Sequence, residues 1–204
     1  MITLVDGGKR YNRQWLFRNL QAEFLPESVT AITGSNGSGK STLLKILAGY
    51  ISLTEGSIAH THDAKQLEYD QLTLHSTIAA PYLDLIEAFT LREAVAFHQK
   101  FKRFKSGASI TDILQFSGLH HKANVPISNF SSGMKQRVKL VLAICTDSPF
   151  LFLDEPCSNL DSNAVEWYND LLSKNLQKRT VVICSNSREG EIRLAQREIR
   201  IESF

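Results

Sequence analysis

One short segment limits the possible folds of this 204-residue chain more than any other. The segment Gly34 to Ser41 has the sequence GSNGSGKS, which matches the phosphate-loop pattern G-x-x-x-x-G-K-[ST]. A short β-rich run, Val29–Thr33, precedes it, and a helical pattern over residues 42–50 follows. A strand, a glycine-rich loop and a helix in this order predict a phosphate-binding loop in an α/β fold.

Each residue type in this loop suits the binding of a triphosphate. Glycines let the backbone turn so that successive N–H groups face a phosphate, and the helix dipole adds positive potential. Lys40 supplies a charge, which makes it a catalytic candidate as well, and the Ser41 hydroxyl can ligate magnesium. A plain glycine-rich turn is the alternative, although this pattern arises by chance in roughly one such chain in a hundred. The expected nucleotide contacts are Gly34, Ser35, Asn36, Gly37, Ser38, Gly39, Lys40, Ser41 and Thr42.

A second candidate site follows the apolar run at residues 150–153, which suits a buried parallel strand. Asp154 and Glu155 come directly after this run, at the strand end where α/β sheets bind ligands. Asp154 is expected to hold magnesium, mostly through water, and Glu155 to orient or deprotonate an attacking water. Taken alone, the pair would more often be a solvated turn. The phosphate loop upstream favours the catalytic interpretation.

The rest of the chain alternates between β-rich and helical patterns, with no internal repeat. Residues 2–5 are predicted to form a strand that ends in a turn at residues 6–8. An apolar run at residues 180–184 is a further strand, and a helix is expected over residues 163–176. Strands that alternate with helices favour an α/β fold with a mostly parallel sheet.

Apolar residues at three-and-four spacing predict a helical insert over about residues 90–146. No linker divides the chain, so we expect one domain over residues 1–204. The net charge of +2 argues neither for nor against nucleic acid or an anionic membrane. Three cysteines without CxxC spacing are expected to be reduced thiols. The most apolar run, residues 140–153, is broken by polar residues and proline, so any membrane role needs a partner.

A third motif, FSSGMKQR, begins at Phe130 and opens a long helical pattern between the two phosphate motifs. By itself, Ser131 would be an ordinary N-cap of a core helix. The segment nevertheless resembles the signature of ABC ATPases, usually written LSGGQ and followed closely by Gln-Arg. It departs from that pattern with Phe130 for Leu, Ser132 for the first Gly and Met134 for Gln.

The resemblance covers essentially the whole chain and implies a P-loop NTPase: a RecA-like core, an N-terminal antiparallel β subdomain and the helical insert. It implies that Ser131, Ser132 and Gly133 hold a γ-phosphate bound to a second copy of the chain, so that catalysis requires a dimer. Residues 158–161 resemble the D-loop, which ends at Asp161. Tyr11 lies where the family places an aromatic that stacks on adenine, although it could simply pack at a strand edge.

Two residues that the family pattern leads us to expect are missing. The last histidine is His121, so Asn186 takes the place of the switch histidine after the strand at residues 180–184. No glutamine lies between Gln71 and Gln99, although the Q-loop glutamine should fall near residues 80–82. Asparagine cannot become cationic, so we expect tight ATP binding with slow hydrolysis.

These patterns leave three possible functions open, all of which use ATP and Mg²⁺. The first is an ATPase subunit at the cytoplasmic face of a membrane that powers a separate permease, similar to short subunits of bacterial exporters, including those for haem in cytochrome c maturation. The second is a slowly hydrolysing, nucleotide-gated dimer with a regulatory or assembly role. The third, DNA repair or chromosome organisation, needs coiled coils or nucleic-acid domains that this sequence lacks, so direct nucleic-acid binding is not expected.

Overall fold

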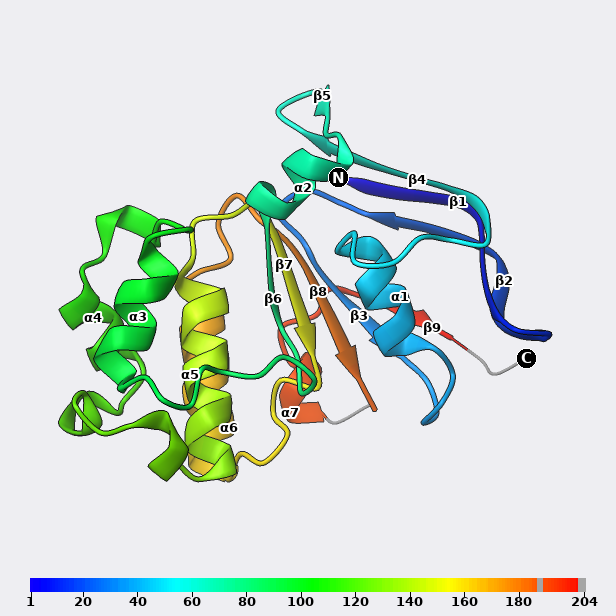
Figure 1. Ribbon diagram of the computed structural model, residues 1–204. Coiled ribbons are helices and arrows are strands. Elements are labelled where there is room, and N and C mark those ends of the chain that lie inside the picture. Colours follow the sequence, from blue (N-terminus) through cyan, green and yellow to red (C-terminus); the bar gives the residue numbers. More distant parts are fainter. Residues whose placement is uncertain (187–188, 202–204) are drawn as a thin grey trace.

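The computed structural model describes residues 1–186 and 189–201, and its central element is a parallel sheet with the strand order β6-β7-β8-β3-β9 (Figure 1). The neighbouring strands in this order all pair in parallel. The innermost strands are buried on both faces and consist largely of apolar residues, as a covered parallel sheet requires. The strands are β3 (Val29–Thr33), β6 (Ser76–Ala79), β7 (Phe150–Asp154), β8 (Thr180–Ser185) and β9 (Arg197–Arg200).

The second sheet has the order β2-β1-β4-β5 and its pairs are antiparallel, as predicted for the N-terminal region. The predicted turn at residues 6–8 is wrong, because β1 continues through it to Tyr11. Asp6 has a φ of 51°, and the register shifts between Leu4 and Gly7 in the pairing with β2 and between Val5 and Gly8 in the pairing with β4. The Asp-Gly-Gly sequence therefore forms a bulge instead of a turn. The strands are β1 (Ile2–Tyr11), β2 (Gln14–Phe24), β4 (Glu55–His62) and β5 (Lys65–Gln66).

Helices cover both faces of the parallel sheet (Figure 1). Helix α1 lies against one face, together with the antiparallel sheet, while α5 and α6 lie against the other and α3 and α4 pack outside α5. The helices are α1 (Lys40–Leu47), α2 (Tyr69–His75), α3 (Leu91–Gln99), α4 (Ile110–Phe116), α5 (Ser132–Cys145), α6 (Ser162–Ser173) and α7 (Glu189–Ile192). Short 3-10 turns occur at Lys105–Gly107, His120–Lys122 and Ile127–Asn129.

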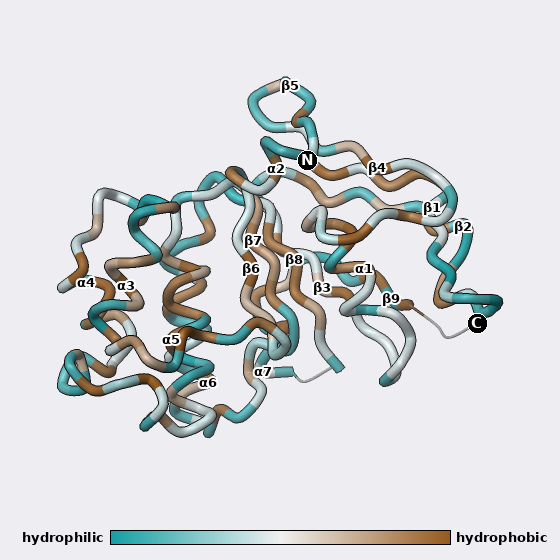
Figure 2. The backbone as a smooth tube through the Cα atoms, in the orientation of Figure 1, coloured by the Kyte–Doolittle hydropathy of each residue, from teal (hydrophilic) through white to brown (hydrophobic). Residues whose placement is uncertain are grey.

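The alternation of side chains along β7 divides the interior into two apolar clusters. Phe150 and Phe152 pack with α1 and the antiparallel sheet, whereas Leu151 and Leu153 pack with the helices on the opposite face. Figure 2 shows hydrophobic residues along these inner strands. The sheet is thereby fixed on both sides, and its carboxyl edge becomes a rigid support for the loops that follow it.

The predicted helices after residue 90 are present, separated at Gly107 and Gly118, which have φ values of 68°. The division into one domain with an insert over residues 90–146 stays a prediction. The helix expected over residues 42–50 begins earlier, at Lys40, and ends earlier, at Leu47. It ends there because Gly49 has a φ of 80°, which stops the helix. Across the described part of the chain, none of the helices combines the length and apolar character needed to cross a membrane.

Candidate nucleotide-binding site

The glycine-rich loop joins β3 to α1 and turns back on itself at its glycines. Gly37 and Gly39 have φ values of 84° and 98°, a region that side chains disfavour. A Cβ at Gly34 would lie 2.2 Å from the Ile201 carbonyl oxygen, so only glycine fits there. The backbone conformation of the loop therefore explains the glycines at these three positions.

Lys40 lies inside this loop and is only 6% exposed. Its Nζ donates to the carbonyl oxygens of Gly34 and Ser35 at 2.9 and 2.8 Å. The cap residue of α1, Gly39, offers no side-chain acceptor to the first-turn N–H groups, and that turn holds no acidic residue. Amide donors and an ammonium group thus converge where a phosphate would lie.

Asp154 ends β7 and is 2% exposed. Its carboxylate interacts with the Ser41 hydroxyl, and its Oδ1 atom has no hydrogen-bond partner among the described residues. Burial raises the pKa of Asp154 above its usual value, and the Ser41 hydrogen bond and the charge of Lys45 oppose that rise.

A buried carboxylate oxygen without a partner, beside a hydroxyl, fits Mg²⁺. This ion takes one or two protein oxygens and keeps waters and phosphate oxygens in its other positions. The described residues contain no group of three or more His, Cys, Asp and Glu side chains that would form an all-protein metal cage. The Ser41 and Asp154 pair therefore suits an ion that arrives with a nucleotide.

Glu155 follows Asp154 in a left-handed conformation, with a φ of 43°. Its Oε1 accepts a hydrogen bond from Asn186 Nδ2 at 2.9 Å, and its Oε2 accepts one from Ser158 Oγ at 3.2 Å. Asn186 comes directly after β8, where the sequence alignment placed the switch position. Both oxygens of Glu155 are thus held by side chains from two different loops.

The signature segment caps α5, and the D-loop caps α6. Ser131 Oγ accepts from Met134 N at 3.3 Å, and Asp161 Oδ1 accepts from Ala164 N at 2.8 Å. A Cβ at Gly133 would lie 2.7 Å from the Asn159 carbonyl oxygen. Ser131 is therefore an N-cap of α5, as the alternative interpretation predicted. The contacts with a second copy stay predictions for Ser131, Ser132, Gly133 and Asp161.

Two tyrosines each have a lysine ammonium over the ring. Tyr11 ends β1, is 50% exposed, and has Lys9 Nζ 5.1 Å from its ring centroid. Tyr82 lies three residues after β6, with Lys45 Nζ 3.8 Å from its ring centroid. Burial and the nearby Asp154 carboxylate raise the pKa of Tyr82. Tyr82 thus occupies the region where the family pattern places the Q-loop glutamine.

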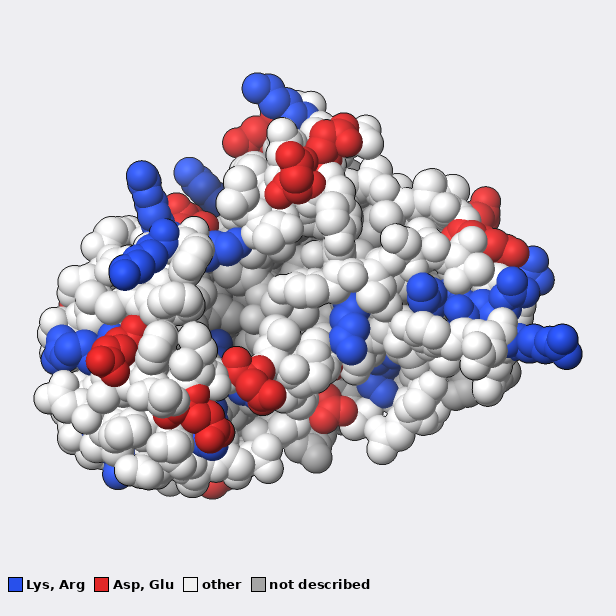
Figure 3. Space-filling view, viewed as in Figure 1, with Lys and Arg blue, Asp and Glu red and all other residues white. Residues whose placement is uncertain are grey.

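The structure brings Lys40, Ser41, Asp154, Glu155 and Asn186 together at the carboxyl edge of the parallel sheet. Sequence reasoning missed Lys45 and Ser158 as contacts in this group. The sequence could have identified Lys45, because it follows Ser41 by four residues and therefore lies on the same face of α1. On the face of the molecule in Figure 3, basic and acidic side chains are interspersed, and no single sign of charge dominates it.

Comparisons with known proteins agree with this geometry. The pattern of the ABC transporter family matches residues 17–158. The uncharacterized ABC transporter ATP-binding protein YybJ of Bacillus subtilis is 31% identical over 196 residues, which is 95% of this chain and 89% of that protein. The cytochrome c biogenesis ATP-binding export protein CcmA of Vibrio vulnificus is 29% identical over 175 residues, 85% of each chain.

Among solved structures, a dimeric ATP-binding cassette in a post-hydrolysis state, bound to ADP and Pi, superposes with a TM-score of 0.84 at 26% identity. The match covers 100% of this chain and 96% of that one. The chain therefore belongs to the ABC transporter family. Within that family it is an ATP-binding cassette with ATPase activity, as the three motifs predicted.

Proposed function

We propose that this cassette binds MgATP between two copies of itself, hydrolyses it slowly, and drives a separate permease from the cytoplasmic face of a membrane. The observation that carries the proposal is the convergence of the phosphate loop, Asp154 and Glu155 at one sheet edge. The dimeric cassette bound to ADP and Pi supports the homodimer.

In the nucleotide complex, Ser41 and Asp154 would hold Mg²⁺, together with phosphate oxygens. When bound, the ion supplies positive charge that offsets charge developing on the transferred phosphoryl group. Lys40 exchanges its carbonyl partners, Gly34 and Ser35, for phosphate oxygens, and its low exposure strengthens those contacts. The remaining loop residues donate backbone N–H groups.

Glu155 is the general base in this proposal. It accepts the proton of the attacking water, while Asn186 and Ser158 hold its two oxygens. A neutral amide at Asn186 responds less to charge developing in the transition state than an imidazolium would. Slow turnover follows from this difference.

The second copy completes the site from the opposite side. Ser131, Ser132 and Gly133 lie at the N-terminus of the partner's α5, where N–H groups and the helix dipole favour a γ-phosphate. Asp161 in the partner's D-loop is the neighbouring contact. Tyr11, exposed at the end of β1, is available to stack on the adenine ring.

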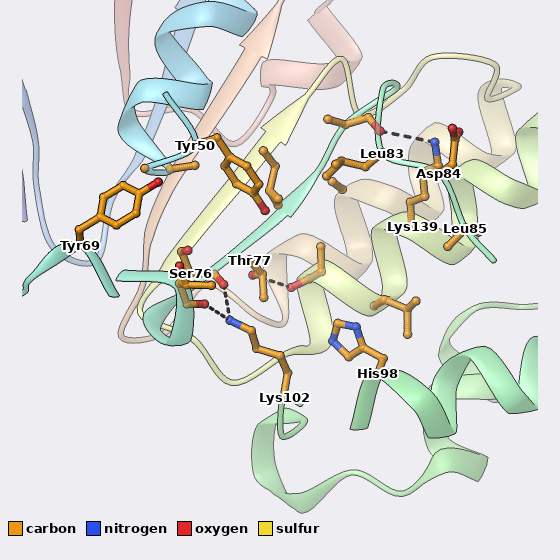
Figure 4. A pocket seen from close by; sticks show the side chains of 18 residues that line it. Tyr50, Tyr69, Ser76, Thr77, Leu83, Asp84, Leu85, His98, Lys102 and Lys139 are labelled. Carbon is orange, nitrogen blue, oxygen red and sulfur yellow. Dashed lines mark hydrogen bonds between the residues drawn. The ribbon is translucent and has the colours of Figure 1, made fainter. Parts of the chain in front are cut away.

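Support for a permease partner comes from an apolar surface beside the site. A cavity of about 480 Å³ lies between α2 and the helices after residue 90, with Tyr50 and Tyr69 on one side and His98, Lys102 and Lys139 on the other (Figure 4). A second cavity, of about 240 Å³, shares His98 and Leu142 with the first and is lined by the aromatic side chains of Phe89, Phe97 and Phe101. We call the exposed residues Tyr69, Leu74, Phe97 and Phe101 the apolar face.

This surface is connected to the nucleotide site through one loop. Lys139 Nζ donates to the carbonyl oxygens of Ala80 and Pro81, at 3.4 and 3.2 Å, and Tyr82 follows directly. A protein bound on the apolar face would therefore change the position of the loop that places Tyr82 against Lys45. Large exposed apolar areas of this kind mark interaction sites.

The test measures ATPase activity with and without the membrane partner. The ATP-loaded Glu155→Gln variant is used to capture that partner from detergent extracts, and the partner is then reconstituted with wild-type chain in nanodiscs. We expect severalfold stimulation that Phe101→Asp abolishes without changing the basal rate. Phe116→Asp, also exposed but on α4, is the matched control. Dimerisation by ATP without any stimulation would favour the regulatory or assembly role, which the substitutions at Asn186 and Tyr82 also suit.

A further inference from the structure

A second, buried carboxylate is hydrogen-bonded to both segments that hold the proposed general base. Glu191 is in α7 and is 1% exposed. Its Oε1 accepts a hydrogen bond from the backbone N–H of Cys157 at 3.1 Å, and its Oε2 accepts one from the Ser185 hydroxyl. Cys157 belongs to the turn after β7 and Ser185 ends β8, so one side chain links two separate segments.

These two contacts stand in a fixed relation to Glu155. Ser158, which holds one oxygen of Glu155, is the chain neighbour of Cys157. Asn186, which holds the other oxygen, is the chain neighbour of Ser185. Each oxygen of Glu155 is therefore held by a residue whose neighbour is held by Glu191.

Glu191 is itself fixed by helix α6. The Tyr168 hydroxyl donates to the Glu191 carbonyl oxygen at 3.3 Å, and Asn169 Nδ2 donates to the Gly190 carbonyl oxygen at 2.9 Å. A Cβ at Gly190 would lie 2.8 Å from Val165 Cγ1, so the two helices are in close contact there. The carboxylate thus extends from a fixed helix toward the two segments of the site that hold Glu155.

A carboxylate withdrawn from water is costly unless hydrogen bonds hold it. The donors that hold this carboxylate include the Cys157 N–H and the Ser185 hydroxyl, each next in the chain to a residue that holds Glu155. We infer that Glu191 is a positioning residue for ATP hydrolysis, fixing the Ser158 and Asn186 contacts and thereby the orientation of Glu155 toward the attacking water. This inference rests on the proposed role of Glu155 as general base.

The experiment compares Glu191→Ala with Glu191→Gln in full-length protein, with single-turnover hydrolysis and ATP binding measured separately. Glu191→Ala removes both contacts, and misorientation of this kind costs up to about a hundredfold in rate. We expect kcat to fall by that amount while the Kd for ATP stays within about twofold. Glu191→Gln keeps an acceptor for Cys157 and a partner for Ser185, and we expect it to retain most of the rate.

Two further measurements keep the result decisive. Ser185→Ala removes one contact only, so it tests the inference even where Glu191→Ala folds poorly; we expect kcat to fall roughly tenfold. In a Glu155→Gln background, Glu191→Ala should lower the residual rate no further, because it acts through Glu155.

Additive losses in that background would overturn the inference, as would a parallel loss of ATP binding or an unchanged kcat in Ser185→Ala and Glu191→Ala. A Glu155→Gln variant as fast as wild type would overturn the proposed general base, and the inference with it. A slow Glu155→Gln variant beside an unaffected Glu191→Ala variant would remove the role of Glu191 alone. The two failures are therefore distinguishable.

Discussion

The phosphate loop and the loops after β6 and β8 lie at the same carboxyl edge of the sheet. They differ in how many of the residues expected from the family pattern they contain. The phosphate loop has every expected residue, and its glycines and Lys40 are fixed by backbone contacts. The other two loops carry Tyr82 in the region, and Asn186 at the position, where the resemblance leads us to expect glutamine and histidine. In the proposed mechanism, the retained residues hold the bound nucleotide, whereas the altered ones would respond to charge that develops during the reaction. Binding and turnover are therefore expected to separate in this protein.

The strongest test of this separation is Glu155→Gln. The variant keeps the shape of the site and loses the base, so kcat should fall by about a thousandfold. The Kd for ATP should change little, and ATP should accumulate in a stable dimer. Radiolabelled ATP hydrolysis and size-exclusion chromatography with MgATP provide the two measurements. A variant that stays monomeric with ATP at high protein concentration contradicts the shared site.

Lys40→Ala tests the other side of the comparison. It removes a charge-assisted contact from a desolvated loop, a loss of about 2 to 3 kcal/mol, or roughly a hundredfold in Kd. Isothermal titration calorimetry with ATP measures it directly. Lys65→Ala, which removes an exposed lysine of β5, is the control. Unchanged ATP affinity in Lys40→Ala would refute the phosphate-loop assignment.

Asn186→His restores the family residue after β8. An imidazole able to become cationic stabilises developing charge that an amide does not, so kcat should rise roughly tenfold. ATP affinity should stay nearly constant, because the gain arises in the transition state. A steady-state ATPase assay decides the outcome. Fast wild-type turnover, or no gain in the variant, would mean that another residue already replaces the switch.

The smallest expected effect is that of Tyr82→Gln. The raised pKa keeps the Tyr82 phenol neutral, and a neutral phenol is a poor ligand for magnesium. An amide oxygen in its place should increase kcat by about threefold and lower the Mg²⁺ concentration needed for half-maximal rate. Magnesium titrations of Tyr82→Gln and Tyr82→Phe compare the two. An equal gain in both variants would show that release of Lys45, not the new oxygen, is responsible.

The phosphate loop was predictable because its requirements are local. Gly34, Gly37 and Lys40 are set by backbone conformation and phosphate chemistry within eight residues of sequence. The positions of Asp154 and Asn186 were predictable because one ends a parallel strand and the other directly follows one, and such strand ends meet at one edge. The long helical pattern before β7 was equally clear from its spacing.

Other features depend on contacts between distant segments and left little trace in the sequence. Glu191 lies in a helix of four residues, and its partners are 34 and 6 positions away in the chain. The bulge in β1 has the composition of a turn, and only pairing with both neighbouring strands decides between them. Strand β6 is short and begins with Ser76 and Thr77, so neither length nor alternation distinguished it.

The close approach of Gly133 to the Asn159 carbonyl joins the beginning of α5 to the D-loop. Because no side chain fits between them, a shift of one segment must carry the other with it. In the proposed dimer, each of these segments would face the nucleotide held mainly by the other copy. Loss of phosphate from one site would therefore change the conformation of the second site. The two ATP molecules of a dimer should then be hydrolysed with negative or positive cooperativity instead of independently.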